Sequence, residues 1–494
     1  MKPKYLGASG FLGHDASFSL LDDGGNILFA SLSERYSKIK HDKFMCQTLW
    51  DELYHKNKNV PGFEVVYHDK CQHNNYNPNI PSDPNKRIEE KVPTEWSDSF
   101  SGHPESHACA ALMTRPESFA KEDCVLVSCD GVGENKSMVI FDHNLNIKKY
   151  HNQPKSVGFL YTSFTTHCGL GLKGNSEEYI VMGLSSYGEP THWEFVYDAF
   201  HCIQESSDNH DRGTRFGWDL IFKYCTKPLL QKTKNVEDAA ASLQKATEVI
   251  LYEFMQEARK YGSKLCYSGG VAQNIMANSK IAELFDDVWV DVCPHDGGGS
   301  LGAAAWKYWK DTGNDRINWQ HPFLGHEIEG TVDPEEVVEH LLSTKYCGIA
   351  NGRAEFGPRA YGNRSLIADV RYDVKDTVNE IKRRQKYRPF APAILEEHAE
   401  EYFEGEMNRW MQFTAKAKHD YNSVTHVDGT ARVQLVPKDC HSVFRKVIEC
   451  YYEKTGIPML LNTSLNIRGE PMVNSFEDAK RWESQYNVRV FTGK

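Results

Sequence analysis

Short apolar runs separated by polar turns fill the first forty residues of the chain. Residues 4–8, 16–21 and 27–31 are largely apolar, with a glycine-bearing turn at 10–13 and an Asp- and Gly-rich turn at 22–26. Runs of this length, bounded by glycine, asparagine and aspartate, are typical of strands joined by tight turns. The pattern predicts strand, turn, strand, turn, strand at the start of the protein.

Longer segments follow in the middle of the chain. Residues 124–129 form a continuous apolar run, which predicts a buried strand, and residues 264–267 predict another. Between them, residues 236–260 carry apolar side chains at helical spacing and end before Gly262. Residues 50–100, in contrast, are polar and rich in Asn, Pro and His, which predicts irregular surface structure.

A change of composition divides the chain in two. Residues 313–329 carry Gly, Asn, Pro and His with little periodicity, as a connection between domains does. We predict a first domain at 1–325, a linker at 326–345 and a second domain at 346–494. We find no internal sequence repeat.

The bulk composition fits a folded protein with more than one domain. The chain has 494 residues, which exceeds an ordinary single core. Apolar residues make up 40% and charged residues 25%, and the net charge of −11 argues against nonspecific coating of nucleic acid. The 13 cysteines lack a Cys-x-x-Cys pair, which favours reduced, buried thiols. Because residues 1–7 lack an apolar run and no segment approaches the roughly 20 apolar residues of a membrane span, we expect a cytoplasmic protein without membrane contact.

Two histidines one helical turn apart are the first candidate for chemistry. Pro104 suits the first turn of a helix, so His103 and His107 are expected on one helix face. Together with Asp296, which follows the predicted strand at 288–292, they form the two-His, one-carboxylate set that suits non-heme iron. The alternative is a helix start with two ordinary histidines, and His295 competes with Asp296 as the third ligand.

Three glycine loops, at residues 130–133, 268–272 and 296–299, each follow a short apolar run. Glycine lets backbone N–H groups approach a phosphate closely. A single loop of this kind is usually a plain turn, whereas three at strand ends favour a nucleotide cleft. The residues expected there are Asp130, Gly131, Gly269, Gly270 and Asn274.

The second domain contains an arginine-rich segment. Residues 353–364 hold three arginines among Gly and Pro, and a basic stretch at 382–388 follows. Arginine forks bind phosphate bidentately, so an anion site is expected, although a solvated basic face is the alternative. A predicted strand at 458–461 leads to Asn462, Ser464 and Asn466, whose side chains suit a polar, uncharged ligand group or a plain turn. A helix capped by the segment from Ser475 is expected to follow.

These motifs together resemble the O-carbamoyltransferases of the nodulation-factor, tobramycin and hydroxymethyl-cephem type. The resemblance covers nearly the whole chain. The matching segments are His14-Asp15-Ala16-Ser17, Ser33-Glu34-Arg35, Lys40-His41-Asp42, residues 103–108, residues 130–133, Val181-Met182-Gly183-Leu184, Gly269-Gly270-Val271-Ala272, residues 355–365, residues 388–392, residues 426–434 and residues 462–466.

The resemblance implies a fold and a reaction. The first domain is expected to be an actin-like α/β fold related to the threonylcarbamoyl-adenosine transferase. The second is expected to resemble the α/β partner that forms carbamoyl-adenylate. In that scheme the second domain converts carbamoyl phosphate and ATP, with Mg²⁺, to carbamoyl-adenylate. The first domain, with iron (Fe²⁺) at its transfer site, then passes the carbamoyl group to an acceptor hydroxyl.

The resemblance also implies roles for individual residues. His14, with Asp15 beside it, looks like the general base or the group that orients the acceptor. His103, His107 and Asp296 look like the iron ligands. The glycine-loop residues look like the adenylate pocket. The carbamoyl phosphate and ATP site is implied for Arg359, Arg364, Lys382, Arg384, Arg388, Arg432, Asn462, Ser464 and Asn466.

The chain departs from the expected pattern at several positions. Ile180 stands where a lysine is expected, Gln385 where a glutamate is expected, and His295 where a glycine is expected before the metal aspartate. The chain also ends soon after residues 477–479, where relatives continue, which suggests a shortened second domain that leans on a partner subunit. The sequence is compatible with a homo-oligomer and does not specify the oligomeric state.

The acceptor is left open between two classes. A small-molecule hydroxyl, on a sugar or an antibiotic, is the first. The second is the hydroxymethyl group of a modified pyrimidine, such as 5-hydroxymethylcytosine, in a nucleotide or in DNA. Tyr76, Lys86, Arg87 and Trp96, within the polar segment 72–96, would stack on a base and touch a phosphate. An actin-fold metabolite kinase and a non-enzymatic ATP-binding regulator are the competing functions.

Overall fold

The computed structural model describes residues 2–10, 14–43, 46–56, 64–69, 100–131, 133, 136–170, 177–203 and 212–493. The chain forms two compact units. The first holds residues 1–37 and 41–320, and the second holds residues 38–40 and 321–494. Each unit has its own sheets, and the division falls at residue 320, whereas the sequence placed the end of the first domain at 325.

The first unit begins with a five-stranded sheet in the order β3-β2-β1-β4-β5. The strands are β1 (Pro3–Ser9), β2 (Ser17–Asp22), β3 (Ile27–Leu32), β4 (Glu64–Asp69) and β5 (Phe100–Gly102). The first three pair antiparallel and the last two continue the sheet in parallel from β1. The predicted opening of three strands is therefore confirmed.

The second sheet of this unit repeats the same topology. It contains β6 (Cys124–Cys129), β7 (Lys136–Phe141), β8 (Ile147–Asn152), β9 (Lys264–Ser268) and β10 (Asp287–Val290). Its order is β10-β9-β6-β7-β8, with β6, β7 and β8 antiparallel and β9 and β10 parallel. If the strands of each sheet are numbered 1 to 5 along the chain, both sheets have the order 3-2-1-4-5. This duplicated arrangement is that of actin-like folds and confirms the α/β prediction. It is a structural repeat that the sequence does not display.

Two helices pack between these sheets. Helix α3 (His103–Met113) contacts β6 and β9, and α11 (Gly299–Thr312) contacts β1, β2 and α3. Gly302 permits the close approach of the two helices, because a Cβ there would lie 2.0 Å from the carbonyl oxygen of Ser106. The start of α3 and the loop before α11 are thereby brought to the same edge of the sheets.

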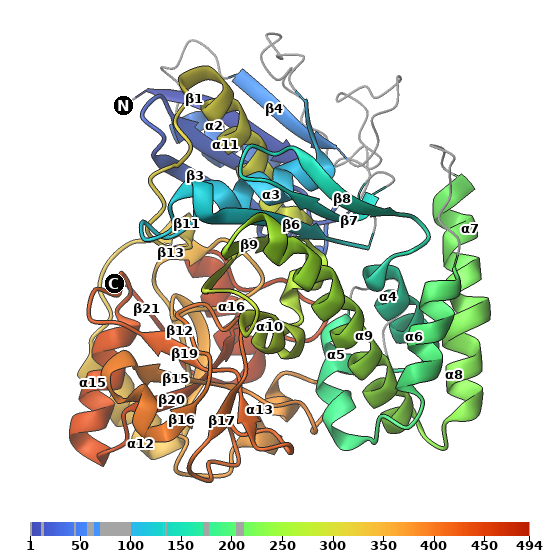
Figure 1. The fold of residues 1–494 in the computed structure, drawn as a ribbon. Helices are drawn as coiled ribbons and strands as arrows, with labels where there is room; N and C mark the ends of the chain where they lie inside the picture. The colour runs from blue at the N-terminus through green and yellow to red at the C-terminus, as the bar shows by residue number, and fades with distance from the viewer. Residues whose placement is uncertain are drawn as a thin grey trace. The chain divides into compact units, whose positions relative to one another are not determined.

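A helical segment lies between β8 and β9 in the chain and extends beside the second sheet (Figure 1). Its helices are α4 (Val157–His167), α5 (Glu178–Leu184), α6 (Trp193–Cys202), α7 (Arg212–Ile221), α8 (Lys227–Lys232) and α9 (Val236–Ala258). Asn235 caps α9 through its side chain, and the helix ends close to the predicted position. Helix α10 (Ile275–Ala282) follows β9 and packs against α9.

The second unit is built on a six-stranded mixed sheet in the order β19-β15-β20-β14-β12-β21. The strands are β12 (Tyr346–Ala350), β14 (Arg364–Ala368), β15 (Ala391–Leu395), β19 (Gln434–Val436), β20 (Met459–Ser464) and β21 (Val490–Thr492). A two-stranded sheet of β11 (Phe323–Ile328) and β13 (Gly352–Glu355) and a small sheet of β16 (Phe403–Glu404), β17 (Ala415–Ala417) and β18 (Thr430–Ala431) complete it. The helices are α12 (Pro334–Thr344), α13 (Lys375–Ile381), α14 (Ala399–Tyr402), α15 (Phe444–Thr455) and α16 (Phe476–Tyr486).

Two local predictions have clear outcomes in this unit. Ser475 caps α16, and Asp478 completes a reciprocal capping box, as expected. The predicted linker at 326–345 is wrong, because it contains the end of β11 and the whole of α12. Its polar residues are the solvent face of α12, while Val337, Val338 and Leu341 are buried.

The prediction of irregular structure at 50–100 is also wrong where the structure describes that range. Helix α2 (Gln47–Lys56) continues into it, and β4 is a parallel neighbour of β1. The strand has only three apolar residues in a row, Val65, Val66 and Tyr67, within a polar region, and a run this short is a weak strand signal. Residues 70–99, including Tyr76, Lys86, Arg87 and Trp96, lie outside the described residues.

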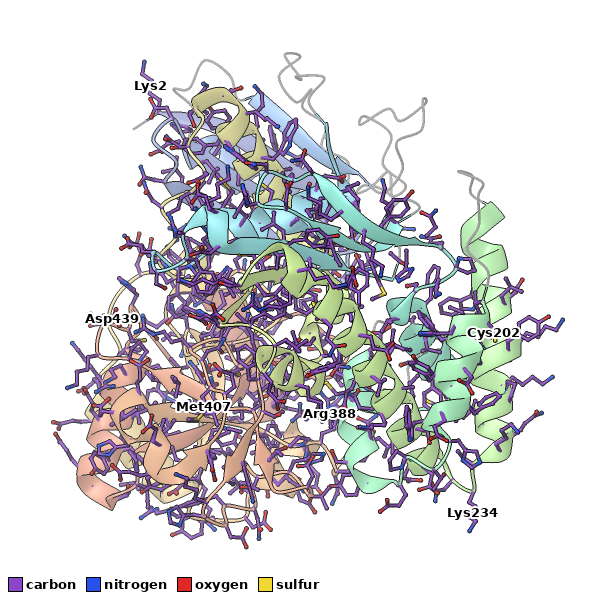
Figure 2. All side chains as sticks on the ribbon, viewed as in Figure 1. Lys2, Cys202, Lys234, Arg388, Met407 and Asp439 are labelled. Atoms are coloured by element: carbon purple, nitrogen blue, oxygen red, sulfur yellow. The ribbon has the colours of Figure 1, made fainter. Side chains whose placement is uncertain are left out.

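The described cysteines are free thiols, and most of them are buried. Cys202, at the end of α6, is an exposed exception and projects from the helical segment (Figure 2). Among the helices of the described ranges, none combines the length and the apolar character needed to cross a bilayer.

Candidate functional site

The two predicted histidines lie together at the start of α3. Pro104 occupies the first turn of the helix, and the rings of His103 and His107 lie 4.7 Å apart between centroids. Both residues are fully buried, at 0% exposure. The spacing therefore produces the shared helix face that the sequence predicted.

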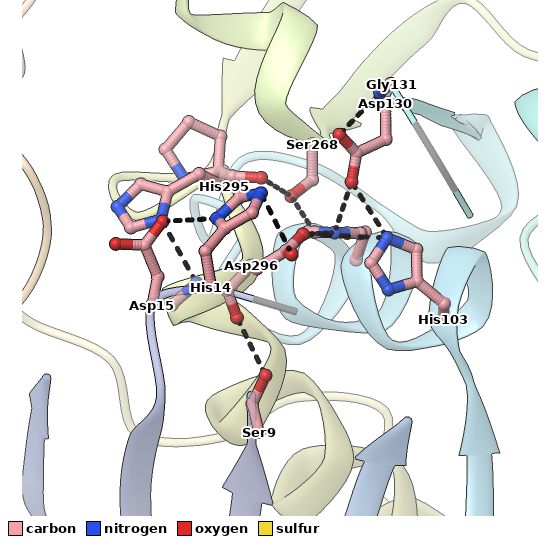
Figure 3. Close-up of polar contacts among 12 residues, drawn as sticks. Ser9, His14, Asp15, His103, Asp130, Gly131, Ser268, His295 and Asp296 are labelled. Atoms are coloured by element: carbon pink, nitrogen blue, oxygen red, sulfur yellow. Dashed lines mark hydrogen bonds and ion pairs between the residues drawn. The ribbon is translucent and has the colours of Figure 1, made fainter. Parts of the chain in front are cut away.

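Two carboxylates approach these rings from the ends of other elements (Figure 3). Asp130 follows β6, and its Oδ2 lies 2.8 Å from Nε2 of His103 and 3.4 Å from Nε2 of His107. Asp296 opens the short turn before α11, and its Oδ1 lies 3.6 Å from Nε2 of each histidine. The four residues offer donor atoms that all lie within 4.8 Å of one another.

The electrostatics of this cluster favour positive charge. Burial lowers the pKa of His107, but hydrogen bonding to Asp130 and Asp296 outweighs it, so that pKa rises to about 9. Two imidazoles and two carboxylates, all buried, form a donor set that suits a divalent first-row metal. The chemistry of the residues present thus fits the metal site that the sequence predicted, with Asp130 as an additional donor.

Ser268 lies between His107 and Asp291. The hydroxyl of Ser268 lies 3.4 Å from Nδ1 of His107 and 3.5 Å from Oδ2 of Asp291. Burial raises the pKa of Asp291 to about 6. Partners of this type orient metal-binding histidines. The sequence singled out Ser268 only as the first residue of a glycine loop, and it did not single out Asp291.

The predicted base lies beside the donor cluster. Nε2 of His14 is 3.6 Å from Oδ2 of Asp296, and its Nδ1 is 2.7 Å from Oδ2 of Asp15. The His14 side chain is 42% exposed, whereas that of Asp15 is 4% exposed. The imidazole is therefore accessible on one side and held by a buried carboxylate on the other.

The predicted nucleotide residues of this unit converge on the same edge. Gly269 has φ of 96°, and a Cβ there would lie 2.1 Å from the carbonyl oxygen of Cys129. A Cβ on Gly270 would lie 3.1 Å from Oδ1 of Asp130, which also accepts from the N–H of Gly131 at 2.6 Å. The glycines are thus required for close packing of these loops, and Asp130, which the sequence assigned to the nucleotide pocket, belongs to the donor cluster.

Asn274 has a local structural role. Its Oδ1 accepts from the N–H of Ala277 at 3.1 Å, which caps α10. Its side-chain amide also donates to Oε1 of Gln244 and accepts from Nε2 of Gln244, both at 3.0 Å. These contacts fix the side chain close to the glycine loops.

The second unit contains a separate group of cations. Arg432 carries a buried Nε that has no hydrogen-bond partner among the described residues. Burial, then the neighbouring charges of Arg359 and Arg388, lower the pKa of Arg432 well below its usual value. Several arginines gathered at one place are suited to bind phosphate or carboxylate groups.

Lys382 lies among the predicted amide and hydroxyl residues of the same unit. Its ammonium donates to the carbonyl of Asn466 and to Oδ1 of Asn466, both at 2.9 Å, and it also contacts Ser464. Burial, then Arg384 and Arg388, lower the pKa of this lysine well below its usual value. The structure therefore brings these predicted residues together, at the end of β20.

Two residues predicted for this site make structural contacts. Arg364 is fully buried, and its guanidinium donates to backbone carbonyls, while its assignment to the phosphate site stays a prediction. The acceptors are the carbonyls of Asn351, Gly352, Asn363, His326 and Asn474. Asn462 is also fully buried and donates to Ala360 and Gln434. Both residues supply donors to backbone carbonyls, because a buried carbonyl needs a hydrogen-bond partner.

Comparison with known proteins places this geometry in a family. Residues 71–305 match the family model described as carbamoyltransferase N-terminus, and residues 338–492 match carbamoyltransferase C-terminus. Nodulation protein NolO of Bradyrhizobium diazoefficiens is 32% identical over 416 residues, which cover 76% of this chain and 75% of that protein. Nodulation protein NolNO of Sinorhizobium fredii is 33% identical over 77% of this chain, and the match spans 61% of that relative's length.

The solved structures that match this chain are less similar to it than the nodulation proteins are. Full-length HypF in its phosphate- and nucleotide-bound form has a TM-score of 0.32 and 14% identity, covering 64% of this chain and 56% of that one. The activator of 2-hydroxyisocaproyl-CoA dehydratase from Clostridium difficile has a TM-score of 0.34 and 12% identity, covering 62% and 95%. The two family models and the NolO relative carry the assignment: the chain belongs to the carbamoyltransferase family of enzymes.

Proposed function

We propose that this protein is an ATP-dependent O-carbamoyltransferase. The second unit would form carbamoyl-adenylate from carbamoyl phosphate and ATP, and the first unit would transfer the carbamoyl group to an acceptor hydroxyl. The observation that supports this proposal is the pairing of two chemically different sites in one chain. One is a cluster of buried histidines and carboxylates in the first unit, and the other is the group of Arg359, Arg388 and Arg432 in the second, where the first two lower the pKa of the third.

The arginine group of the second unit suits the activation step. Carbamoyl phosphate, ATP and water would give carbamoyl-adenylate, phosphate and pyrophosphate. Arg359, Arg388 and Arg432 would hold the phosphate groups and offset the charge that develops as they leave. Because these cations repel one another without a ligand, polyanion binding would be favourable. Lys382, Ser464 and Asn466 would present the adjacent polar surface to the carbamoyl group.

The donor cluster of the first unit would hold a divalent metal, for which we propose Fe²⁺. The ligands would be His103, His107, Asp130 and Asp296, whose donor atoms lie within 4.8 Å of one another. The ion would offset the negative charge of the adenylate phosphate. The glycine loops beside it, at Gly131 and Gly269–Gly270, would let the nucleotide approach the backbone.

His14 would act as the general base of transfer. Its Nε2 lies 3.6 Å from Asp296 and its side chain is 42% exposed, so an acceptor hydroxyl can reach it beside the donor cluster. A neutral imidazole is suited to take a hydroxyl proton near neutral pH. The acceptor oxygen would then bond to the carbamoyl carbon.

We propose a small-molecule hydroxyl, as on a sugar or an antibiotic, as the acceptor. The net charge of −11 disfavours a duplex DNA partner. The alternative, a hydroxymethylated pyrimidine, rested on Tyr76, Lys86, Arg87 and Trp96, which lie outside the described residues. A metabolite kinase is disfavoured, because both family models describe carbamoyltransferases.

Product identity tests the proposal. The full-length protein, supplied with Fe²⁺, Mg²⁺, ATP and carbamoyl phosphate, would be incubated with an aminoglycoside panel, nucleoside monophosphates and hydroxymethylcytosine DNA. Mass spectrometry of the digested products should show a carbamoyl increment on a small molecule, with pyrophosphate released. A phosphoryl increment would identify a kinase, and carbamoylated DNA with unmodified small molecules would reverse the acceptor assignment.

A further inference from the structure

The carboxylate of Asp15 contacts three histidines. Its Oδ2 lies 2.7 Å from Nδ1 of His14, and its Oδ1 lies 2.8 Å from Nδ1 of His41. Nδ1 of His295 is farther away, 3.4 Å from Oδ2. Figure 3 shows Asp15 between His14 and the loop that carries His295. Asp15 is 3% exposed, so the charge of this carboxylate depends on these neighbours rather than on water.

The hydrogen-bond network assigns the donors. The N–H of Gly297 donates to Nδ1 of His295 at 3.1 Å, which makes that nitrogen an acceptor. A neutral His295 therefore cannot also donate from Nδ1 to Asp15. His14 and His41 remain as the two Nδ1–H donors, one to each oxygen of Asp15. With its proton on Nδ1, His14 presents the lone pair of Nε2 toward Asp296 and the acceptor side.

The backbone of this segment is held in an uncommon conformation. Asp15 has φ of 61° and His41 has φ of 54°, both in the left-handed region. Such residues cost about 1–3 kcal/mol each and are concentrated at functional sites. The N–H of His41 donates to Oε2 of Glu34 at 2.8 Å, which fixes the position of His41. The two strained residues are the same two whose side chains are hydrogen-bonded.

We propose that His41 is a positioning residue for carbamoyl transfer, acting through Asp15 on His14. This inference rests on the proposed function. The Nδ1–H of His41 holds Asp15 so that Asp15 fixes the tautomer and direction of His14. In the transfer step, the acceptor proton passes to Nε2 of His14 and the acceptor oxygen bonds to the carbamoyl carbon. The bond from that carbon to the adenylate phosphate oxygen breaks, and AMP leaves.

A second interpretation of Asp15 and His41 is that they belong to a metal site. Asp15, Glu34 and His41 offer donor atoms within 4.8 Å of one another. However, Oδ1 of Asp15 already accepts from His41, and Oε2 of Glu34 accepts from a backbone N–H. These hydrogen bonds account for the arrangement with protons alone, and the metal content of variants distinguishes the two readings.

Two substitutions of His41 separate positioning from folding. In His41→Asn the amide nitrogen stands near the position of Nδ1, and asparagine tolerates the left-handed region. In His41→Gln the amide reaches the position of Nε2, and the donor to Asp15 is lost. His143→Gln, on a turn after β7, is the matched control. With tobramycin as acceptor probe, we expect His41→Gln to lower kcat about 10- to 100-fold with little change in KM, and His41→Asn to stay near the wild-type value.

A spectroscopic measurement decides the proposal whatever the acceptor is. In ¹⁵N-histidine NMR of the Zn²⁺-loaded full-length protein, His14, assigned by its loss in His14→Gln, should carry its proton on Nδ1. His41→Gln should change His14 to a mixture of the Nδ1–H and Nε2–H tautomers, and His41→Asn should leave the Nδ1–H tautomer unchanged. An unchanged His14 signal in His41→Gln, or a second bound metal lost in that variant, would overturn the inference. If His41→Gln shows the tautomer shift but the wild-type protein forms no carbamoylated product, the result would instead count against the proposed function.

Discussion

Nε2 of His103 lies 2.8 Å from Oδ2 of Asp130, across 27 residues of chain. This contact joins the start of α3 to the end of β6 and completes a cluster of two histidines and two carboxylates. A pair of histidines on one helix turn has several explanations, but a pair that faces two buried carboxylates has the composition of a metal centre.

Substitution of Asp130 should weaken the metal site. In Asp130→Asn the amide can still accept from Gly131, but it loses the charge that faces His103 and His107. We expect bound metal and carbamoyl transfer to fall at least about tenfold, while pyrophosphate release by the second unit is unchanged. Elemental analysis and product assays measure both effects. The exposed Asp198→Asn is the charge-matched control, and full metal content in Asp130→Asn would contradict the assignment.

Removal of the metal should separate the two partial reactions. Chelation of the full-length protein is expected to abolish transfer and to leave adenylate formation intact once Mg²⁺ is restored. Because a ligand that binds only the folded state stabilises it by mass action, Fe²⁺ should also raise the melting temperature of the first unit. Transfer that survives complete stripping would count against a metal role.

Arg432→Ala should abolish activation without destabilising the protein. Its Nε is buried, and burial, then the charges of Arg359 and Arg388, lower the pKa of Arg432, so its removal relieves repulsion. We expect pyrophosphate release to fall about 10²- to 10³-fold and the melting temperature of the ligand-free protein to be unchanged or higher. Exposed Lys446→Ala serves as the control. Normal pyrophosphate release by Arg432→Ala would remove it from the phosphate site.

Arg364→Ala should behave in the opposite way. Six hydrogen bonds from its guanidinium to backbone carbonyls would be lost. We expect a destabilisation of about 3–5 kcal/mol, because buried carbonyl groups lose their donors, and a lysine should not restore it since it lacks the planar fork. Denaturant unfolding measures the change. If Arg364→Ala were stable and lost only its affinity for ATP, the result would support a phosphate-binding role for Arg364.

His321 should make the second unit less stable in weak acid. Burial, then the charge of His441, lower the pKa of His321 to about 4. The unfolded chain binds a proton near pH 6.5, whereas the folded protein does not until about pH 4. Stability therefore falls as pH decreases from about 6.5 to 4, by at most about 3 kcal/mol. His321→Phe should flatten unfolding curves in this range, and an unchanged pH dependence would contradict the assignment.

Local sequence determined a good part of this fold. The opening strands, the long helix α9 and the capping box at Ser475 follow from side-chain periodicity and from hydrogen bonds between near neighbours. The shared face of His103 and His107 follows from helical geometry alone. These features need only interactions within a few residues, so the sequence predicts them without knowledge of the rest of the chain.

Tertiary structure decided which residues meet. Arg364 and Arg432 are both arginines in motifs of the same family, yet Arg364 donates to backbone carbonyls, whereas Arg432 lies near Arg359 and Arg388. The difference lies in partners such as Asn474, which is 110 residues from Arg364. Asp130 likewise joined the donor cluster only because α3 packs against β6. Desolvation and hydrogen bonding act on neighbours in space, and neither periodicity nor motif spacing specifies those neighbours.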